Sequence, residues 1–271
     1  MSTTSRTANG AYIELCNRYD IDIVIDPVTT LNTKFDVLAG ETPTADEKLI
    51  NQYFFIGNGG HKSGASVENS TTITAAERKV TANALFSHLA FVMVPVESDL
   101  DAGRREEYRM RVRETHHGTD YYCYYGKKFD IGDIVPTTQI RTNNSGSISF
   151  TPHTPTMADL SPVQPTGGVS NKDLVVSLTI PFTLTEQEVA EIYDAADIKW
   201  GVTGHAVISE IGIASGADRD VSMDNNGTTY TGKEIVACQL TTSVAIGRLL
   251  SLGESYGVTR ITVGSLDPIG I

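Results

Sequence analysis

The sequence predicts a mainly β protein, of the sandwich or barrel-like kind, with two or three short helices and one long extended arm; an α+β fold is the alternative. Three observations lead to this prediction. Residues 107–129 carry a strong two-stranded pattern, several other segments alternate or are short and apolar, and residues 142–170 are rich in proline and small polar residues.

The clearest single pattern is a β-hairpin over residues 107–129. Its first strand alternates apolar residues with arginines, the period of two that a half-buried strand requires. The apolar set is Tyr108, Met110 and Val112, and the arginines are Arg109, Arg111 and Arg113. His116, His117 and Gly118 mark the turn, and the aromatic run YYCYY at residues 121–125 favours a paired second strand.

The other elements follow from the same signals. Strands are expected at residues 19–27, 89–96, 132–141, 174–182, 206–214, 234–246 and 258–263, with a hairpin turn at Asn226-Gly227. Capping boxes, in which Thr is followed three residues later by Glu, predict helices at residues 45–53 and 75–87 and, most clearly, after Thr185 and Glu188. No internal repeat is present, which argues against a solenoid or propeller.

The domain organisation is predicted from changes in composition. Residues 1–18 are expected to form a flexible N-terminal lead, because the first ten are polar and show no periodicity. Residues 19–141 form the first half of a β-rich core, and residues 171–271 form its second half, in the same domain. Between them, residues 142–170 cannot bury enough apolar surface to fold alone and are predicted to be an arm or linker.

Composition narrows the class of function. The chain has 271 residues and a net charge of -12, so nucleic acid and anionic lipid should repel it. Its cysteines, Cys16, Cys123 and Cys238, are few and far apart, as expected for free thiols of a protein folded in a reducing cytoplasm. A secretory signal is not expected, nor is any apolar run near the roughly 18 residues of a spanning helix.

Two segments resemble ligand-binding loops but depart from the required spacing. The run from Gly57 to Ser63 resembles a phosphate loop, yet His61 stands where a glycine must precede Lys62. The acidic run of Asp218, Asp220, Ser222 and Asp224 has the alternating oxygen ligands of a calcium loop. Met223 stands at its glycine position, however, and Thr229 stands where the loop requires Glu. An ordinary loop is the favoured interpretation of both.

The sequence contains no catalytic motif, and its adjacent histidines do not indicate an enzyme. His116 and His117 are adjacent, so a strand would direct them to opposite faces, and a turn or subunit contact is favoured over a metal site. No GxSxG motif is present, and Cys123, inside an aromatic strand, is expected to be an inert core thiol. The sequence therefore predicts no catalytic residue, no metal and no cofactor.

The arginine row is the concentrated basic feature of an acidic chain. Arg109, Arg111 and Arg113 each need carboxylates, carbonyls or phosphates around the guanidinium. Pairing with acids of the same chain and pairing with an acidic face of another subunit are both consistent with the pattern. Contact with DNA inside a channel is a third, less favoured reading.

Several segments in order resemble virion structural proteins of tailed bacteriophages, the β-rich subunits of the neck, collar, tail or baseplate. They are FFIGNGG (54–60), HLAFVMVPVESDL (88–100), RREEYRMRV (104–112), YYCYYGKKFD (121–130) and AVISEIGIASG (206–216). The resemblance implies a symmetric ring or adaptor in the virion, made in the host bacterial cytoplasm, whose partners are its own copies and other virion proteins. From charge and composition, no membrane is expected and nucleic acid is disfavoured as a partner.

Arm exchange and charged interfaces would hold such an assembly together, because exchanged arms add interface area without enlarging the core. The residues expected at these contacts are Arg109, Arg111, Arg113, His116, His117, Pro152, Pro155, Pro162 and Pro165. One alternative is a carbohydrate- or receptor-binding β-domain that stacks sugars on the tyrosines of residues 121–125. A phosphate-binding enzyme that uses Lys62 is a second alternative.

Overall fold

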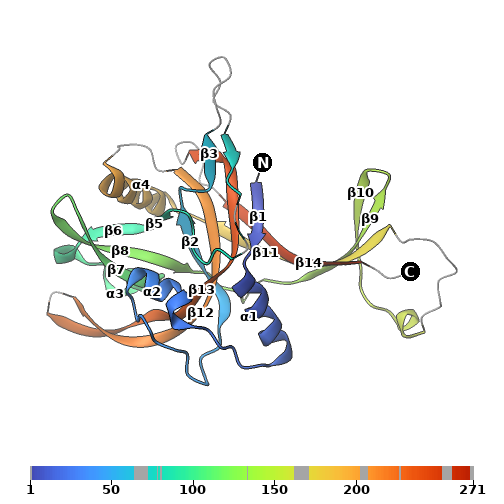
Figure 1. Ribbon diagram of the computed structural model, residues 1–271, viewed down its shortest axis with the longest axis horizontal. Helices are drawn as coiled ribbons and strands as arrows, with labels where there is room; N and C mark the ends of the chain where they lie inside the picture. Colours follow the sequence, from blue (N-terminus) through green and yellow to red (C-terminus); the bar gives the residue numbers. More distant parts are fainter. Residues whose placement is uncertain are drawn as a thin grey trace, which may run out of the picture. The chain divides into compact units, whose positions relative to one another are not determined.

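The computed structural model describes residues 2–63, 73–77, 79, 81–132, 134–161, 171–201, 207–225, 227–251 and 258–268. It confirms a mainly β protein built from antiparallel strands with a few short helices (Figure 1). The chain divides into two compact units. Unit 1 comprises Met1–Phe129 and Leu184–Gly257, and unit 2 comprises Asp130–Thr183 and Val258–Ile271.

Unit 1 is organised around an eight-stranded sheet in the order β1-β13-β12-β2-β8-β6, with β5 on β2 and β7 on β8. Its strands are β1 (Ser2–Arg6), β2 (Ile50–Gly57), β5 (His88–Leu89), β6 (Val92–Pro95), β7 (Tyr108–His116), β8 (Thr119–Lys128), β12 (Val207–Asn225) and β13 (Thr228–Ser251). A separate pair is formed by β3 (His61–Ser63) and β4 (Ile73–Ala75). The helices of unit 1 are α1 (Ala8–Tyr19), α2 (Leu31–Phe35), α3 (Ala102–Arg105) and α4 (Glu186–Trp200), with short 3₁₀ turns η1 (Pro27–Thr29) and η2 (Val96–Ser98).

The predicted central hairpin is confirmed as β7 and β8. His117 and Gly118 connect the strands with φ of 51° and 84°, the two positive values of a type I′ turn. Because the loop has two residues, His116 pairs with Thr119 and the register runs back to Tyr108 opposite Lys127. Gly118 supplies the positive φ without strain, whereas His117 adopts it as a side-chain-bearing residue.

The predicted flexible lead is wrong, because the N-terminus forms β1 and α1. β1 pairs with β13 in register from Ser2 opposite Ile246 to Arg6 opposite Thr242. Thr7 then caps α1, its side chain accepting the Gly10 amide at 2.9 Å. A Cβ on Gly10 would lie 2.3 Å from the Thr241 carbonyl oxygen, so only glycine lets the helix approach β13 this closely.

Three other predicted elements are wrong for identifiable reasons. Residues 19–27 do not form a strand, since α1 runs to Tyr19 and ends at Asp20 in the left-handed region. Residues 45–53 are not a helix: Thr44 donates its amide to Glu47, but the chain from Ile50 onward, buried from Gln52, becomes β2. Residues 75–87 begin as the end of β4 and contain no helix within their described part.

The elements with the strongest local signals are confirmed. α4 has the predicted capping box, in which Thr185 and Glu188 each bond the backbone of the other. The predicted strand at residues 89–96 is present as β6 at Val92–Pro95, preceded by the short β5 at His88–Leu89. β12 and β13 extend the two strands predicted on either side of Asn226-Gly227, of which Asn226 lies outside the described residues. Their sequences are locally consistent with the fold, which is why pattern alone identifies them.

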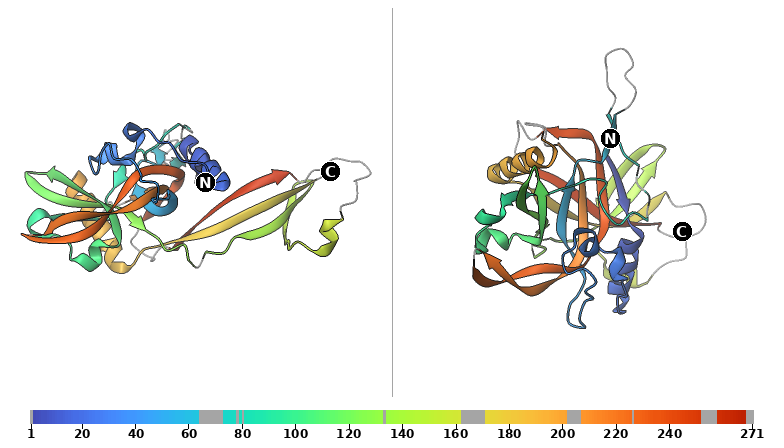
Figure 2. Two further views of the ribbon diagram at one scale, coloured as in Figure 1. Left: turned by 90° about the horizontal axis from the view of Figure 1, so that it is seen from below. Right: turned by 60° about the vertical axis from the view of Figure 1, so that its left-hand side comes forward.

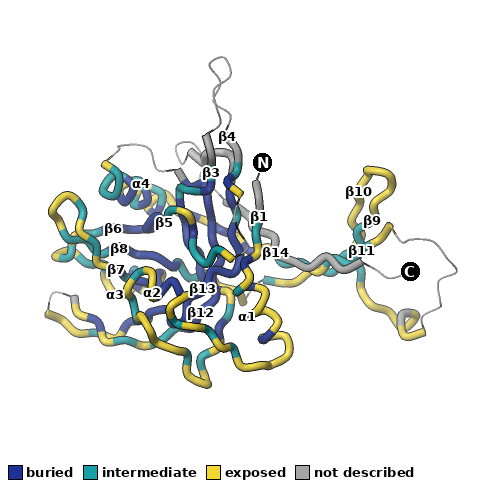
Figure 3. Tube along the Cα trace, viewed as in Figure 1, coloured by how far each residue is buried: buried dark blue, intermediate teal, exposed yellow. Residues whose placement is uncertain are grey.

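Many buried residues of unit 1 lie along β2, β8, β12 and β13, drawn dark blue in Figure 3, and others come from β6, β7 and the helices. Within β13, a bulge between the pairs Ser215–Gln239 and Ala217–Val236 leaves Ala237 with φ of 51°, and Asn32 of α2 hydrogen-bonds to the backbone there. Its side chain donates to the Ile235 carbonyl and accepts the Cys238 amide, both at 2.7 Å. A buried amide thus attaches α2 to the irregular part of β13.

Unit 2 is a four-stranded antiparallel sheet in the order β10-β9-β11-β14, together with a 3₁₀ turn, η3 (Met157–Leu160). Its strands are β9 (Thr137–Asn144), β10 (Ser147–Pro152), β11 (Lys172–Thr183) and β14 (Val258–Pro268). β11 and β14 run side by side from Asp173 opposite Pro268 to Thr183 opposite Val258 (Figure 2). β9 and β10 are joined by a second two-residue turn, with positive φ at Ser145 and Gly146.

The predicted arm at residues 142–170 is therefore replaced in part by regular structure. Residues 142–152 belong to the β9–β10 hairpin, and this hairpin lies in the same sheet as β11 and β14. Composition pointed to an arm because residues 142–152 are mostly polar. Backbone pairing within the β9–β10 hairpin and with β11 nevertheless gives this part of the chain regular structure. The division into units consequently falls at residues 130, 184 and 258 and not at residues 142 and 170.

Candidate functional site

The arginine row on β7 is paired within the chain. Arg109 Nε lies 3.1 Å from Asp218 Oδ1, and Arg111 Nη1 lies 2.6 Å from Asp99 Oδ2. Arg113 pairs with Asp120 across the hairpin and keeps 62% of its side chain exposed. Internal pairing, one of the two readings that the sequence left open, accounts for Arg109 and Arg111.

Asp218 is the centre of a polar network between β2, β7, β8 and β12. It accepts from the Tyr53 hydroxyl and the Lys128 ammonium, each at 2.7 Å, as well as from Arg109. Burial acts to raise the pKa of Asp218, but the bonds from Lys128, Tyr53 and Arg109 outweigh it and hold that pKa below its usual range. The Asp218 carboxylate is therefore ionised, and its oxygens accept hydrogen bonds from Tyr53, Lys128 and Arg109.

A second ion pair, Arg105 with Glu234, is among the most buried charges of unit 1. Its side chains are 1% and 7% exposed. The guanidinium also donates to the Tyr108 carbonyl and lies 5.3 Å from the centre of the Tyr124 ring. Burial raises the pKa of Glu234 to about 7 despite the neighbouring cation. This pair fixes α3 and β7 to β13.

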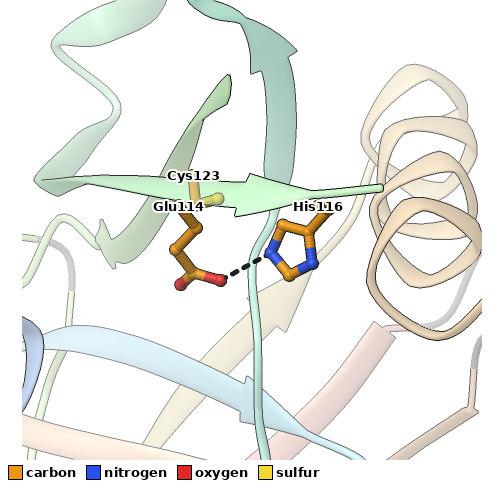
Figure 4. Close-up of side chains that lie close together, drawn as sticks. All are labelled: Glu114, His116 and Cys123. Carbon is orange, nitrogen blue, oxygen red and sulfur yellow. Dashed lines mark hydrogen bonds and ion pairs between the residues drawn. The ribbon is translucent and has the colours of Figure 1, made fainter. Parts of the chain in front are cut away.

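The opposite face of the same hairpin brings together Glu114, His116 and Cys123 (Figure 4). Residues 114 and 116 point to one face of β7, and Cys123 of β8 stands opposite Val112 on that same face. One ligand atom from each of the three residues lies within 4.8 Å of the others. A carboxylate, an imidazole and a thiol thus share one small volume.

Neighbouring groups hold this cluster in place. The Glu114 carboxylate accepts from the Tyr125 hydroxyl at 2.9 Å and lies 2.8 Å from His116 Nε2. Lys199 of α4 lies 3.5 Å from the Tyr125 hydroxyl and donates to the His88 carbonyl. Burial raises the pKa of the Cys123 thiol to about 12, so the thiol is protonated when no metal is bound to it.

Sequence reasoning missed this cluster because it considered His116 together with His117. The structure separates them: His117 lies in the turn, while His116 faces Glu114 and Cys123. The signal was present, since a loop of two residues at 117–118 fixes the register and places residues 114, 116 and 123 on one face. The expectation that Cys123 is a buried thiol is confirmed.

The glycine-rich loop after β2 does not present its amides to a ligand. The Gly59 amide donates to the Glu210 carboxylate at 3.1 Å, and the Gly60 amide donates to the Ser209 hydroxyl at 3.0 Å. Glu210 also accepts the Phe86 and Ser87 amides. Side chains of β12 therefore already accept the Gly59 and Gly60 amides.

The acidic run at residues 218–224 lies in β12 and not in a loop. Asp218 is held by Arg109 and Lys128, Asp220 pairs with Lys233 at 2.6 Å, and Asp224 accepts the Gly227 amide. Paired in this way, the three carboxylates do not converge on a common point as calcium ligands do.

The tyrosine run does not form an open stacking platform. Tyr124 and Tyr125 are buried, and the Arg111 guanidinium lies 4.4 Å from the centre of the Tyr122 ring. Stacking on a sugar requires an exposed ring face. The structure therefore offers no observation that favours carbohydrate binding at this run.

The exposed apolar side chains of unit 2 form its distinctive surface. Ile148 and Phe150 of β10 are 51% and 54% exposed, and Val176 of β11, Met157 and Leu160 are exposed too. Among the residues of unit 2 whose side chains are described, Ile180 and Phe182 are the buried ones. Pro152 ends β10 and Pro155 follows it, while Pro162 and Pro165 lie outside the described residues.

The fold and these side chains define a β-rich protein of two units, one with an ion-paired core and one with an exposed sheet. The chain belongs to DUF7208, a family of unknown function, whose profile matches residues 1–270. The comparisons with curated proteins and with solved structures give no match. None of the helices in the described part of the chain has the length and apolar character needed to cross a membrane.

Proposed function

We propose that this protein is a structural subunit of a tailed-phage virion, in the neck, collar, tail or baseplate, and that it assembles as a symmetric ring or adaptor through unit 2. The class comes from the resemblance of its segments to such proteins. The observation that supports assembly is the sheet of unit 2, which carries exposed apolar side chains and very few buried ones.

A single antiparallel sheet needs a second layer to bury an apolar face. In β11 the residues at positions 174, 176, 178, 180 and 182 are all apolar and share one face, yet Val176 is 37% exposed. Ile148 and Phe150 share a face of β10. A layer supplied by other subunits would bury these side chains and would favour order in the sheet.

The edge of the sheet offers a second type of contact. β10 is the terminal strand in the order β10-β9-β11-β14, so the outer backbone groups of its described residues have no ladder partner. Addition of a strand from another subunit would satisfy them. Pro152 at the end of β10 limits the length of such a pairing.

Charge contributes less to this assembly than the sequence alone led us to expect. Arg109 and Arg111 are already paired with Asp218 and Asp99, so breaking those pairs for an interface would leave buried carboxylates unpaired. Arg113 and the exposed turn residue His117 remain accessible. We therefore assign the main contacts to the apolar side chains of unit 2.

The test is the mass of the protein in solution, measured by sedimentation for the wild type and for Ile148→Ser combined with Phe150→Ser. We expect the wild type to form a discrete multimer, alone or with other virion proteins, and the double variant to dissociate. The matched control is Val24→Ser combined with Val28→Ser, which replaces two exposed apolar residues of unit 1 and should leave the mass unchanged.

A wild type that is strictly monomeric and binds no other virion component would contradict the proposal. So would a multimer that persists unchanged in the double variant of β10.

A further inference from the structure

We propose that Glu114, His116 and Cys123 form a three-ligand site for zinc on one face of the β7–β8 hairpin. This site is independent of the assembly proposed for unit 2, because all three residues belong to unit 1.

The donor set fits zinc. Zinc accepts thiolate sulfur, imidazole nitrogen and carboxylate oxygen, and three protein ligands plus one water complete its tetrahedral coordination. Calcium and magnesium prefer oxygen ligands, so a site with sulfur and nitrogen disfavours them.

The distances are within reach of coordination. In a tetrahedral site with bonds of roughly 2.0–2.3 Å, ligand atoms lie roughly 3.3–3.7 Å apart. The three ligand atoms here lie within 4.8 Å of one another, and His116 Nε2 and Glu114 Oε2 are 2.8 Å apart. Small rotations of Glu114 and His116, whose side chains are 25% and 18% exposed, would bring the set to coordination distance.

The charge balance favours a doubly charged cation. With Cys123 as thiolate and Glu114 as carboxylate, the two ligand charges neutralise Zn²⁺, and His116 binds as the neutral ring. A neutral complex has a much smaller desolvation cost than an isolated buried ion. The thiol proton leaves to solvent when the Zn–S bond forms.

Tyr125 acts as a positioning residue. Its hydroxyl donates to Glu114 Oε1 at 2.9 Å, which leaves the other carboxylate oxygen, Oε2, for the metal. Groups of this kind orient the ligands of zinc sites. Lys199 donates to the His88 carbonyl and lies 3.5 Å from the Tyr125 hydroxyl. It contacts the positioning residue and not the ligand Glu114.

The experiment uses the full chain, stripped with a chelator and titrated with Co²⁺ and with Zn²⁺. Cobalt reports the ligands through its tetrahedral visible bands and a thiolate charge-transfer band in the near ultraviolet. We expect one Co²⁺ per chain with both features, and displacement of Co²⁺ by Zn²⁺. Calorimetry on the wild type should give the same stoichiometry.

Matched variants assign the ligands. Cys123→Ser should abolish the charge-transfer band and His116→Asn should weaken binding, while Cys238→Ser and His117→Asn should retain wild-type spectra. Tyr125→Phe should lower affinity by about 10–100-fold while the thiolate band remains. Circular dichroism without metal checks that each variant is folded. If a ligand variant is not folded, Glu114→Gln, which changes the third proposed ligand, is used in its place and should weaken metal binding.

Absence of Co²⁺ and Zn²⁺ binding by the wild type would overturn the proposal. A charge-transfer band that survives Cys123→Ser, or that is lost in Cys238→Ser, would overturn it as well.

Discussion

Units 1 and 2 obtain their order in different ways. In unit 1, strands are covered by other elements, and even charged residues such as Arg105 and Glu234 are buried as pairs. In unit 2, Ile148, Phe150 and Val176 are exposed, while Ile180 and Phe182 are the buried side chains of its described part. Its strands are joined by antiparallel backbone pairing. Both units expose some apolar side chains, but unit 1 also has a large buried core, whereas the described part of unit 2 buries these two side chains. The exposed apolar side chains of unit 2 are therefore the kind of surface that subunit contacts bury.

Removal of one buried charge gives the largest expected effect and sharpens the description of unit 1. Arg105→Ala leaves Glu234 buried without its cation and removes packing against Tyr124. We expect unfolding of unit 1 to become easier by about 3–5 kcal/mol. Denaturant unfolding monitored by circular dichroism measures this. A loss similar to that of Arg113→Ala, whose side chain is mostly exposed, would contradict the assigned role.

The pH dependence of the same pair is the second expected effect. Burial raises the folded-state pKa of Glu234 to about 7, above its unfolded value, so the folded state binds more protons between these two values. The stability contributed by this group is therefore present at low pH and is lost as pH rises toward 7, by up to roughly 3 kcal/mol.

Comparison with Glu234→Gln isolates the effect of this one group. The free energy of unfolding of the wild type minus that of the variant should decrease between pH 4.5 and pH 7.5, about the interval set by the unfolded pKa and the folded pKa of about 7. A difference that is constant or rises with pH would show that the Arg105 charge dominates over burial.

A helix cap in unit 1 gives a smaller effect. Thr185→Ala removes the side chain that accepts the Glu188 amide at the start of α4. We expect a loss of about 1 kcal/mol in the free energy of unfolding. Thr185→Ser keeps the hydroxyl and is the matched control, so equal losses in both variants would show that the cap does not contribute.

The smallest effect on folding is expected in unit 2. Phe150→Ser in the dissociated protein should change the free energy of unfolding by less than about 0.5 kcal/mol, because the side chain is 54% exposed. The same change should weaken assembly. A loss of several kcal/mol in the dissociated protein would mean that Phe150 packs within its own chain, which would break the contrast between the units.

The sequence predicted the parts of the fold whose signals are local. β7 and β8, α4 with its capping box, and β11 follow from alternation, turn chemistry and capping over a few residues. The N-terminus was missed because β1 pairs with β13, more than 200 residues away, and nothing in residues 2–6 announces that partner.

The candidate sites show the same limit. The pairing of Arg105 with Glu234 and of Arg109 with Asp218 depends on the tertiary fold, so the sequence left internal pairing and a subunit interface equally open. The cluster of Glu114, His116 and Cys123 was within reach, because the two-residue turn at 117–118 alone fixes which residues share its face.

Hydrogen exchange of the backbone amides in dilute and concentrated protein tests the central contrast most directly. Assembly through unit 2 predicts that amides of β12 and β13 exchange slowly and equally at both concentrations, whereas amides of β9 and β10 exchange rapidly when dilute and become protected when concentrated. Equal exchange of β9 and β10 at both concentrations, in a sample whose mass also stays that of one chain, would contradict it.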